Sequence, residues 1–413
     1  MELTVIFGFI SALLLVAVAA NRLSGITRVP DLIVLLTIGV LLGPVLHWSD
    51  PARFQGVVQV LGTLALILIL FQGGLEIQLR QAARYLPAGV LLAFVGVGLS
   101  MALIAVAGRY LLHVSWIDAV LIGAALGCTS GSVVLPVLHQ IKTSEPVKIV
   151  LTTESSIGEI LAVLTVGSII SVGGEQSLLV GVASGFLRSV GIAALLGGAV
   201  GAIWSRFWPR LMHVPFHNVL NLGIVFAVYA TSRFLGGSGL LATLLFGVTL
   251  ANVPRTPYMI RAGMQMMAFH SELTFLVRSF FFVLLGFVAE FARRGYILAT
   301  LGILAGMVLA RYVAVLSMRW SVKDATSKEK ELLFWMLPRG LVTAVLALDI
   351  VNTRGASFSF LPAVAFTVVV ISNLFVVWGS IRAANVVPVP AVVPIQAPVA
   401  VPEGVASKAV GAD

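Results

Sequence analysis

The sequence predicts an all-α polytopic membrane protein with about thirteen transmembrane helices. Only 10% of its 413 residues are charged and 59% are apolar, whereas a soluble globular protein carries about 25% charged residues. The apolar residues form runs of about twenty, the number that an α-helix needs to cross the hydrocarbon core of a bilayer. The forty glycines suit the close packing of helices in lipid.

Each predicted span is an apolar run bounded by loops that hold charged residues, prolines or glycines. The first run is long enough to span and lacks a convincing small-residue cleavage site, so we expect it to be retained. The single cysteine, Cys128, excludes a disulfide framework within one chain. In order, we place the spans near residues 3–20, 29–46, 57–75, 87–108, 117–138, 147–171, 178–204, 218–234, 238–252, 270–290, 295–317, 331–350 and 359–380.

The distribution of basic residues predicts the orientation in the membrane. An odd number of spans places the two termini on opposite sides. With the N-terminus outside, sixteen Lys and Arg residues fall in cytoplasmic segments and six in outer loops. The excess favours an inner-membrane protein with its N-terminus outside and its C-terminus in the cytoplasm. It also explains the net charge of +9 without a nucleic-acid partner.

The last segment, 383–413, differs in composition from the membrane domain at 1–382. It is rich in Val, Pro and Ala and has little charge until its end. Such a segment cannot build a core, so we expect a disordered cytoplasmic tail. A regulatory docking segment is the alternative.

Two of the predicted spans are interrupted near their middle. Spans 1–6 and 8–13 can form two inverted six-helix repeats, because the seventh span reverses the second set. The fifth span of each set carries polar or helix-breaking residues, Thr129-Ser130-Gly131 in one and Pro338-Arg339-Gly340 in the other. Paired interruptions predict broken, crossing helices and an ion site at the midplane. The alternative for 129–131 alone is local Ser and Thr bonding to the preceding turn.

Two carboxylates, Glu154 and Glu159, lie inside the sixth predicted span. A charged side chain at the bilayer centre costs about 2.5–3.5 kcal/mol on insertion scales, which marks a functional site by default. Five residues apart, the two acids lie about 140° apart around a helix and face different partners.

We expect Glu154 to form a structural ion pair with a buried arginine. Arg311 and Arg339 are the candidates, and Arg278 is a less favoured third. Glu159 lacks a dedicated base and shares a helix face with Ser155, which predicts that it binds either a cation or a proton. A protonated structural glutamate is the alternative.

In order and spacing, the motifs resemble the monovalent cation/proton antiporter family, specifically its thirteen-span sodium/proton exchanger branch, over about residues 29–380. The segments that carry the resemblance are 29–33 with Gly43-Pro44, 71–76, 129–131, 154–159, 281–286 and 338–341.

The resemblance implies the sodium/proton antiporter fold in a homodimer. Its scaffold would comprise about 1–80 and 218–290, and its mobile core about 87–171 and 295–380. It implies that Glu159, Ser155 and the Thr129 carbonyl coordinate a transported Na⁺, Li⁺ or K⁺, with Ser130 and Gln72 nearby. The expected helix breaks involve Gly131, Gly158, Pro338 and Gly340.

The sequence departs from the family pattern around this site. Ser130 stands where the family has Asp, Gly158 where it has Asn, and Glu159 where it has Asp. Some relatives carry a glutamate at the position of Gln72. These departures leave Glu159 as the principal titrating carboxylate.

The function expected is electroneutral exchange of one monovalent cation for one proton by alternating access, with lipid as the surroundings and no cofactor. The sequence has no phosphate-binding loop of the G-x-x-x-x-G-K-[ST] type, and we do not expect an enzyme. The alternatives are an ion channel, a transporter of the same fold for another ion or substrate, and a non-transporting membrane sensor.

Overall fold

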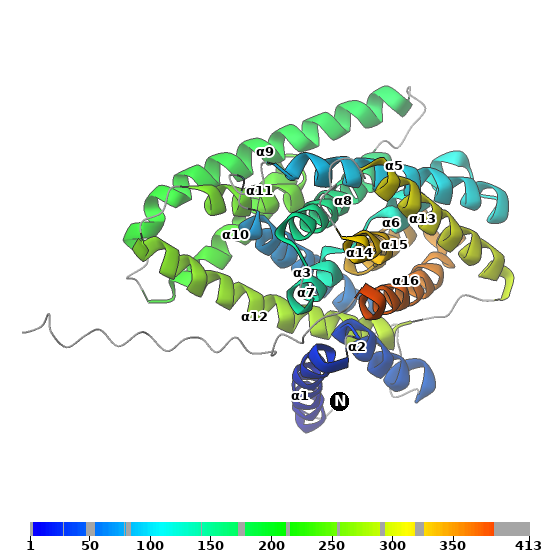
Figure 1. Cartoon of the computed structure of the whole chain (residues 1–413), viewed down its shortest axis with the longest axis horizontal. Helices are drawn as coiled ribbons and strands as arrows, with labels where there is room; N and C mark the ends of the chain where they lie inside the picture. The colour runs from blue at the N-terminus through cyan, green and yellow to red at the C-terminus, as the bar shows by residue number, and fades with distance from the viewer. Residues whose placement is uncertain are drawn as a thin grey trace, which may run out of the picture.

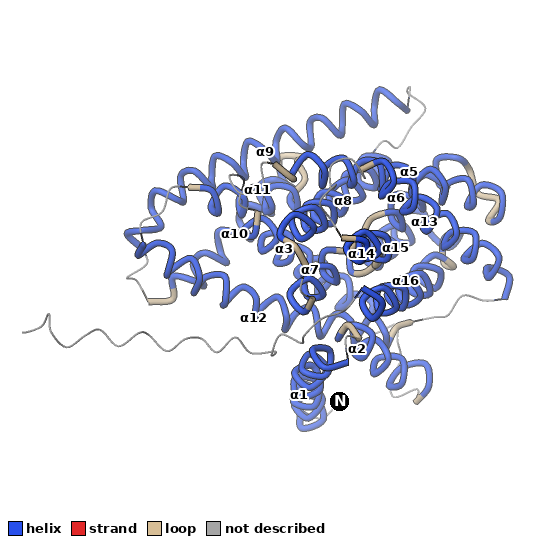
Figure 2. The backbone as a smooth tube through the Cα atoms, in the orientation of Figure 1, coloured by secondary structure: helices blue, strands red, loops and turns tan. Residues whose placement is uncertain are grey.

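The computed structural model describes residues 3–27, 29–46, 54–77, 79, 84–141, 143–171, 178–211, 215–253, 257–289, 294–318 and 326–383. Regular structure in these residues is helical throughout (Figures 1 and 2). Of the predicted tail, 384–413 lie outside the described residues.

The helices follow the predicted spans in order. The first set comprises α1 (Leu3–Thr27), α2 (Asp31–Val40) with the π-helical turn η1 (Leu41–Val45), α3 (Gln55–Glu76), α5 (Leu86–Leu111), α6 (Trp116–Gly127), α7 (Gly131–Gln140) and α8 (Glu145–Ser171). After α9 (Leu178–Leu211), which corresponds to the seventh predicted span, the second comprises α10 (His217–Phe234), α11 (Gly239–Asn252), α12 (Pro257–Phe287), α13 (Ile297–Ser317), α14 (Ser327–Trp335), α15 (Leu341–Arg354) and α16 (Leu361–Ala383). The short 3₁₀ turns η3 (Arg294–Tyr296) and η4 (Gly355–Phe358) precede α13 and follow α15.

The helices confirm the predicted polytopic all-α membrane fold. Among the described residues, ten helical segments are long and apolar enough to cross a membrane, and two apolar helical segments are shorter. The count of thirteen spans stays a prediction. One helix starts well before its predicted span: α12 begins at Pro257, and its apolar segment of membrane length begins at Gly263 rather than near residue 270.

Both predicted interruptions are present. The gap between α6 and α7 covers residues 128–130, and the gap between α14 and α15 covers 336–340. Gly158 is not a break, and that prediction is wrong: α8 runs unbroken through it. A Cβ on Gly158 would lie 3.2 Å from Val97 Cγ2. The glycine therefore allows close packing of α8 against α5 rather than a bend.

Two groups of helices meet at the breaks. In one, α5 packs against α6, α8 and α13; in the other, α3 packs against α11 and α12, and α12 against α2. Figure 1 shows α9 and α12 along opposite edges, with α3, α7, α8 and α14 between them. Glycines bring the second group close: a Cβ on Gly74 of α3 would lie 3.1 Å from the Cα of Gly247 on α11. Such contacts are typical of membrane helix interfaces.

Candidate functional site

The two helix breaks contact each other directly. The N–H of Ser130 in the first break donates a 2.9 Å hydrogen bond to the carbonyl of Pro338 in the second. A Cβ on Gly340 would lie 2.6 Å from Ser130 Oγ, so a side chain at Gly340 would displace the hydroxyl of Ser130. The crossing that sequence reasoning predicted thus contains one backbone hydrogen bond and one close approach at a glycine.

Side chains of α16 form hydrogen bonds with the backbone of the second break. The backbone N–H of Arg339 donates to Ser372 Oγ at 2.9 Å, and Asn373 Nδ2 donates to the carbonyl of Arg339 at 2.7 Å. Non-helical backbone at membrane depth is tolerated only where protein or a water-filled cavity satisfies its polar groups. Ser372 and Asn373 therefore allow α14 and α15 to be separate helices.

Glu159 projects from α8 onto the N-terminus of α7. Its Oε1 accepts hydrogen bonds from the Gly131 N–H at 2.8 Å and from Ser130 Oγ at 3.1 Å. Only 1% of the residue is exposed. The unpaired N–H groups and the dipole of a helix N-terminus stabilise a carboxylate there. Among the described residues, Oε2 has no hydrogen-bond partner, so one oxygen is held and the other is free to bind.

Ser155 faces the same point from one turn earlier on α8. A Cβ on Gly131 would lie 3.5 Å from Glu159 Oε2 and 3.6 Å from Ser155 Oγ. The hydroxyl of Ser155 is buried and donates to the carbonyl of Thr152 at 3.1 Å, which leaves its oxygen able to face a cation. The absence of a side chain at Gly131 thus leaves a small space bordered by two oxygens.

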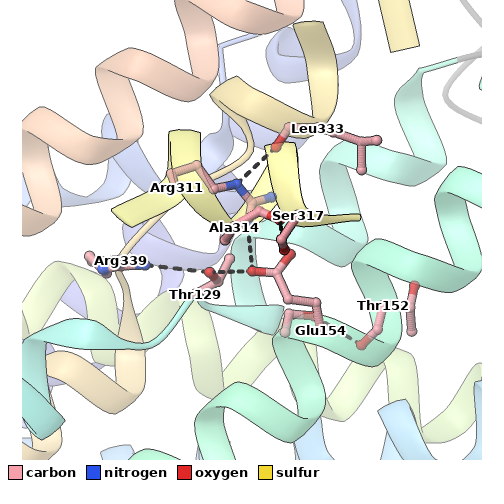
Figure 3. A network of polar contacts seen from close by, with 9 residues as sticks. Thr129, Thr152, Glu154, Arg311, Ala314, Ser317, Leu333 and Arg339 are labelled. Carbon is pink, nitrogen blue, oxygen red and sulfur yellow. Dashed lines mark hydrogen bonds and ion pairs between the residues drawn. The ribbon is translucent and has the colours of Figure 1, made fainter. Parts of the chain in front are cut away.

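Thr129 in the first break links this site to a buried ion pair (Figure 3). Its Oγ1 donates to Glu154 Oε1 at 2.8 Å and accepts from Arg339 Nη1 at 3.4 Å. Glu154 Oε1 also pairs with Arg311 Nη1 of α13. Glu154 is 2% exposed and Arg311 4%. Arg311 Nε donates to the Leu333 carbonyl of α14 at 2.9 Å, so this network joins α8, α13, α14 and both breaks.

The side chain of Gln72 has other hydrogen-bond partners than the site residues. Its amide donates to Glu76 Oε1 at 3.3 Å and to Ser271 Oγ at 3.1 Å, and none of its hydrogen bonds among the described residues reaches Glu159. It lines a cavity of about 420 Å³ between α3, α7, α8 and α12. Thr152 also lines this cavity, on the same face of α8 as Ser155 and Glu159.

A second cavity of about 590 Å³ lies at the other end of α3. It is lined by Gly56 and Gln59 near the start of α3, whereas Gln72 and Glu76 near its end line the first cavity. The wall opposite α3 includes Asn352 of α15 and Tyr296. The two cavities therefore lie near opposite ends of one helix.

Sequence reasoning missed a second buried ion pair. Arg278 of α12 pairs with Asp31 at the start of α2 and also donates to the carbonyl of Ser132 on α7. It was considered only as a less favoured partner for Glu154. The sequence signals were an acid directly after Pro30 at the start of an apolar span and an arginine inside another span.

The comparisons with known proteins agree with this geometry. The family model for the transmembrane domain of sodium/hydrogen exchangers matches residues 9–384. The chain belongs to the sodium/hydrogen exchanger family. This confirms the resemblance found in the motifs, and the match extends from α1 to the end of α16.

Two relatives are K⁺/H⁺ antiporters. The chain is 27% identical over 384 residues to the K⁺/H⁺ antiporter NhaP of Alkalimonas amylolytica and 28% identical over 378 residues to the K⁺/H⁺ antiporter NhaP2 of Shewanella oneidensis. These alignments cover 90% and 89% of the exchanger but only 64% of each relative. The Na⁺/H⁺ antiporter 1 of Methanocaldococcus jannaschii is 24% identical, over 85% of the exchanger and 84% of the relative.

A solved structure shares the fold. The sodium proton antiporter MjNhaP1 of Methanocaldococcus jannaschii superposes with a TM-score of 0.73 at 21% sequence identity, covering 92% of the exchanger and 96% of that chain. The overall arrangement of helices in this exchanger is therefore that of the NhaP antiporters.

Proposed function

We propose that this exchanger is a secondary-active, electroneutral antiporter that exchanges a monovalent cation for a proton by alternating access. The environment of the Glu159 carboxylate is the observation that supports this proposal. The group is buried and has one oxygen without a hydrogen bond, and no arginine or lysine lies within 4 Å of it among the described residues. The names of the relatives, K⁺/H⁺ and Na⁺/H⁺ antiporters, support the same activity.

In this mechanism, Glu159 Oε2 binds either the proton or the cation. The cation occupies the space beside Gly131 and is coordinated by Glu159 Oε2, Ser155 Oγ and the carbonyl of Thr129, with Ser130 holding the other carboxylate oxygen. A bound cation prevents protonation of the same oxygen, and a bound proton removes the charge that attracts the cation. One titrating carboxylate thus exchanges one proton for one cation.

The remaining architecture follows from this mechanism. The exchanger would work as a homodimer in the inner membrane, with its N-terminus outside and its C-terminus in the cytoplasm. The core, about 87–171 and 295–380, would move against the scaffold, about 1–80 and 218–290. The network from Glu154 to Arg311 supports a rigid core, because it joins α8, α13 and α14. The cavities at the two ends of α3 would be the two access routes.

Transport in proteoliposomes tests the proposal. The purified exchanger is reconstituted, a Na⁺, Li⁺ or K⁺ gradient is imposed, and internal pH is followed with a dye. We expect the cation gradient to drive protons against their own gradient, which distinguishes an antiporter from a channel. A sensor that has lost transport would show no pH change with any of the three cations.

A pair of matched variants assigns the site. Glu159→Gln removes the titrating group with little change of shape, and we expect no exchange. Glu331→Gln is the control, because it makes the same chemical change at a partly exposed glutamate of α14 whose ion-pair partner is Arg382, 3.8 Å away. This variant should exchange at the unaltered rate. Exchange by Glu159→Gln at the unaltered rate would show that the proposed site is wrong.

A further inference from the structure

A proline inside α7 leaves one backbone carbonyl without its helical partner. In an α-helix the N–H of each residue bonds the carbonyl four residues earlier. Pro136 has no N–H, so the carbonyl of Ser132 lacks this donor. Ser132 is 4% exposed, and an unsatisfied polar group at that depth is costly.

Arg278 of α12 supplies the missing donor. Its Nη1 donates to the carbonyl of Ser132 at 2.9 Å, and its Nη2 pairs with Asp31 of α2. Arg278 is 6% exposed and Asp31 5%. One guanidinium therefore takes the place of the Pro136 N–H while its charge is balanced by a carboxylate.

The contact lies next to the group that holds Glu159. Ser132 Oγ and Ser130 Oγ are 2.8 Å apart, and Ser130 Oγ donates to Glu159 Oε1. The hydroxyl proton of Ser130 is used in that bond, so Ser132 is the donor to Ser130. Three consecutive residues, Ser130 to Ser132, therefore connect the guanidinium of Arg278 to the carboxylate of Glu159.

The two helices that carry Asp31 and Arg278 are closely packed. Glycines bring α2 and α12 together, because a Cβ on Gly39 would lie 2.8 Å from the Cα of Gly286. Asp31 and Arg278 thus project from two tightly packed helices of the scaffold onto the first turn of a short core helix. α7 has only ten residues, and a displaced first turn would carry Ser130 and Gly131 away from Glu159.

We propose that Arg278 is a positioning residue that fixes the cation site to the scaffold through the carbonyl freed by Pro136. The inference rests on the proposed function, since it concerns the affinity of that same site. It also implies a step in alternating access: when the core moves, the hydrogen bond from Arg278 to Ser132 has to open, whereas the Asp31–Arg278 pair stays on the scaffold.

The test combines removal of the contact with restoration of the missing donor. Asp31→Asn/Arg278→Gln removes both charges together and leaves no isolated buried ion. We expect the cation concentration for half-maximal exchange to rise about tenfold to a hundredfold, the range for a buried hydrogen bond to a charged group. Pro136→Ala gives the Ser132 carbonyl its own helical N–H. In that background the same double variant should change this concentration less than about twofold, because the contact has become redundant.

A matched control lies on the same helix. Ser279 is buried beside Arg278, and within the described part of the chain its hydroxyl bonds only the carbonyl of Phe275 on α12 itself, so Ser279→Ala should leave the half-maximal concentration unchanged. If the charge-free double variant does not fold, Arg278→Lys replaces it. A lysine keeps the charge but cannot hold Asp31 and the Ser132 carbonyl in the same two-pronged geometry.

Two results would overturn the proposal. The first is that the double variant folds and needs the same cation concentration for half-maximal exchange, while only its maximal exchange rate is lower. General loss of structure would give that result. The other is a rise that Pro136→Ala does not suppress. The suppression can also be measured without transport, from the melting temperatures of four proteins: the unaltered protein, the double variant, Pro136→Ala, and the double variant in the Pro136→Ala background. A chain that shows the suppression but no exchange would therefore refute the proposed function and not this contact.

Discussion

Removal of one partner from the buried Glu154–Arg311 pair should strongly destabilise the exchanger. Arg311→Met keeps an unbranched side chain but leaves Glu154, which is 2% exposed, with Thr129 Oγ1 as its only remaining donor among the described residues. The Leu333 carbonyl also loses the donor at 2.9 Å. Breaking a buried pair in this way costs about 3–5 kcal/mol. At about 1.4 kcal/mol per factor of ten, the unfolding equilibrium shifts by two to more than three orders of magnitude.

Removing both charges should cost much less than removing one. In Glu154→Gln/Arg311→Met neither partner of the pair is left charged, and the introduced amide can still accept from Thr129. The residual loss is the donor to Leu333, about 1–2 kcal/mol for one buried carbonyl. The double variant is therefore expected to be more stable than Arg311→Met alone by about 2 kcal/mol.

Equilibrium unfolding in mixed micelles, followed by tryptophan fluorescence as denaturing detergent is added, measures this double-mutant cycle. The exposed pair of Glu331 and Arg382, 3.8 Å apart, provides the control, with an expected coupling of about 0–1 kcal/mol. The reasoning is refuted if the Glu154 and Arg311 substitutions are additive, because a buried pair has to show coupling.

Two further predictions concern the ionisation of Glu329 on α14 and the packing of α12 against α2. Burial opposes ionisation of Glu329, but hydrogen bonds from Ser144 and Thr326 outweigh it and lower its pKa from 4.5 to about 2. A folded-state pKa below the unfolded one stabilises above about pH 4.5 and is lost toward about pH 2. The melting-temperature gap between the unaltered protein and Glu329→Gln should therefore close over that range; a constant gap would contradict it. Gly286→Ala should destabilise by about 1–3 kcal/mol, because its Cβ meets the backbone of α2. Gly198→Ala, with nothing within 4 Å, should be neutral or stabilising by up to about 1 kcal/mol; equal thermal shifts would exclude the packing explanation.

The sequence was sufficient for the broken helices because their cause is local. Thr129-Ser130-Gly131 and Pro338-Arg339-Gly340 each combine poor helix formers in the middle of an apolar run, at matching places in two halves. Gly158 shows the limit of this reasoning. A single glycine inside a helix costs only about 1 kcal/mol relative to alanine, and the contact of α8 with α5 compensates for it.

The choice of partner for a buried charge depended on tertiary structure. Arg311 and Arg339 are both central in apolar spans, and nothing local distinguishes them. The structure separates them because Ser372 and Asn373 hold the backbone of Arg339 in the second break, where its side chain reaches Thr129.

The pairing of Arg278 was missed for a related reason. Its carboxylate partner lies 247 residues earlier in the chain, and its second acceptor is a backbone carbonyl. The unpaired carbonyl could have been inferred, because Pro136 inside an apolar run always frees the carbonyl four residues before it. Which basic side chain would reach that carbonyl could not be inferred from the sequence, because Arg278 lies on α12 and comes near α7 only in the folded chain.

The charges around the crossing support the proposal that exchange at this site is electroneutral. Two of the buried acids are neutralised by arginines, Asp31 by Arg278 and Glu154 by Arg311, and these pairs contribute no net charge in any transport state. Glu159 is the acid left to change its charge. A proton and a monovalent cation each add one positive charge to it, so both loaded forms of the core carry the same total charge. The membrane potential therefore acts equally on the inward and outward steps, and it performs no net work over a complete cycle.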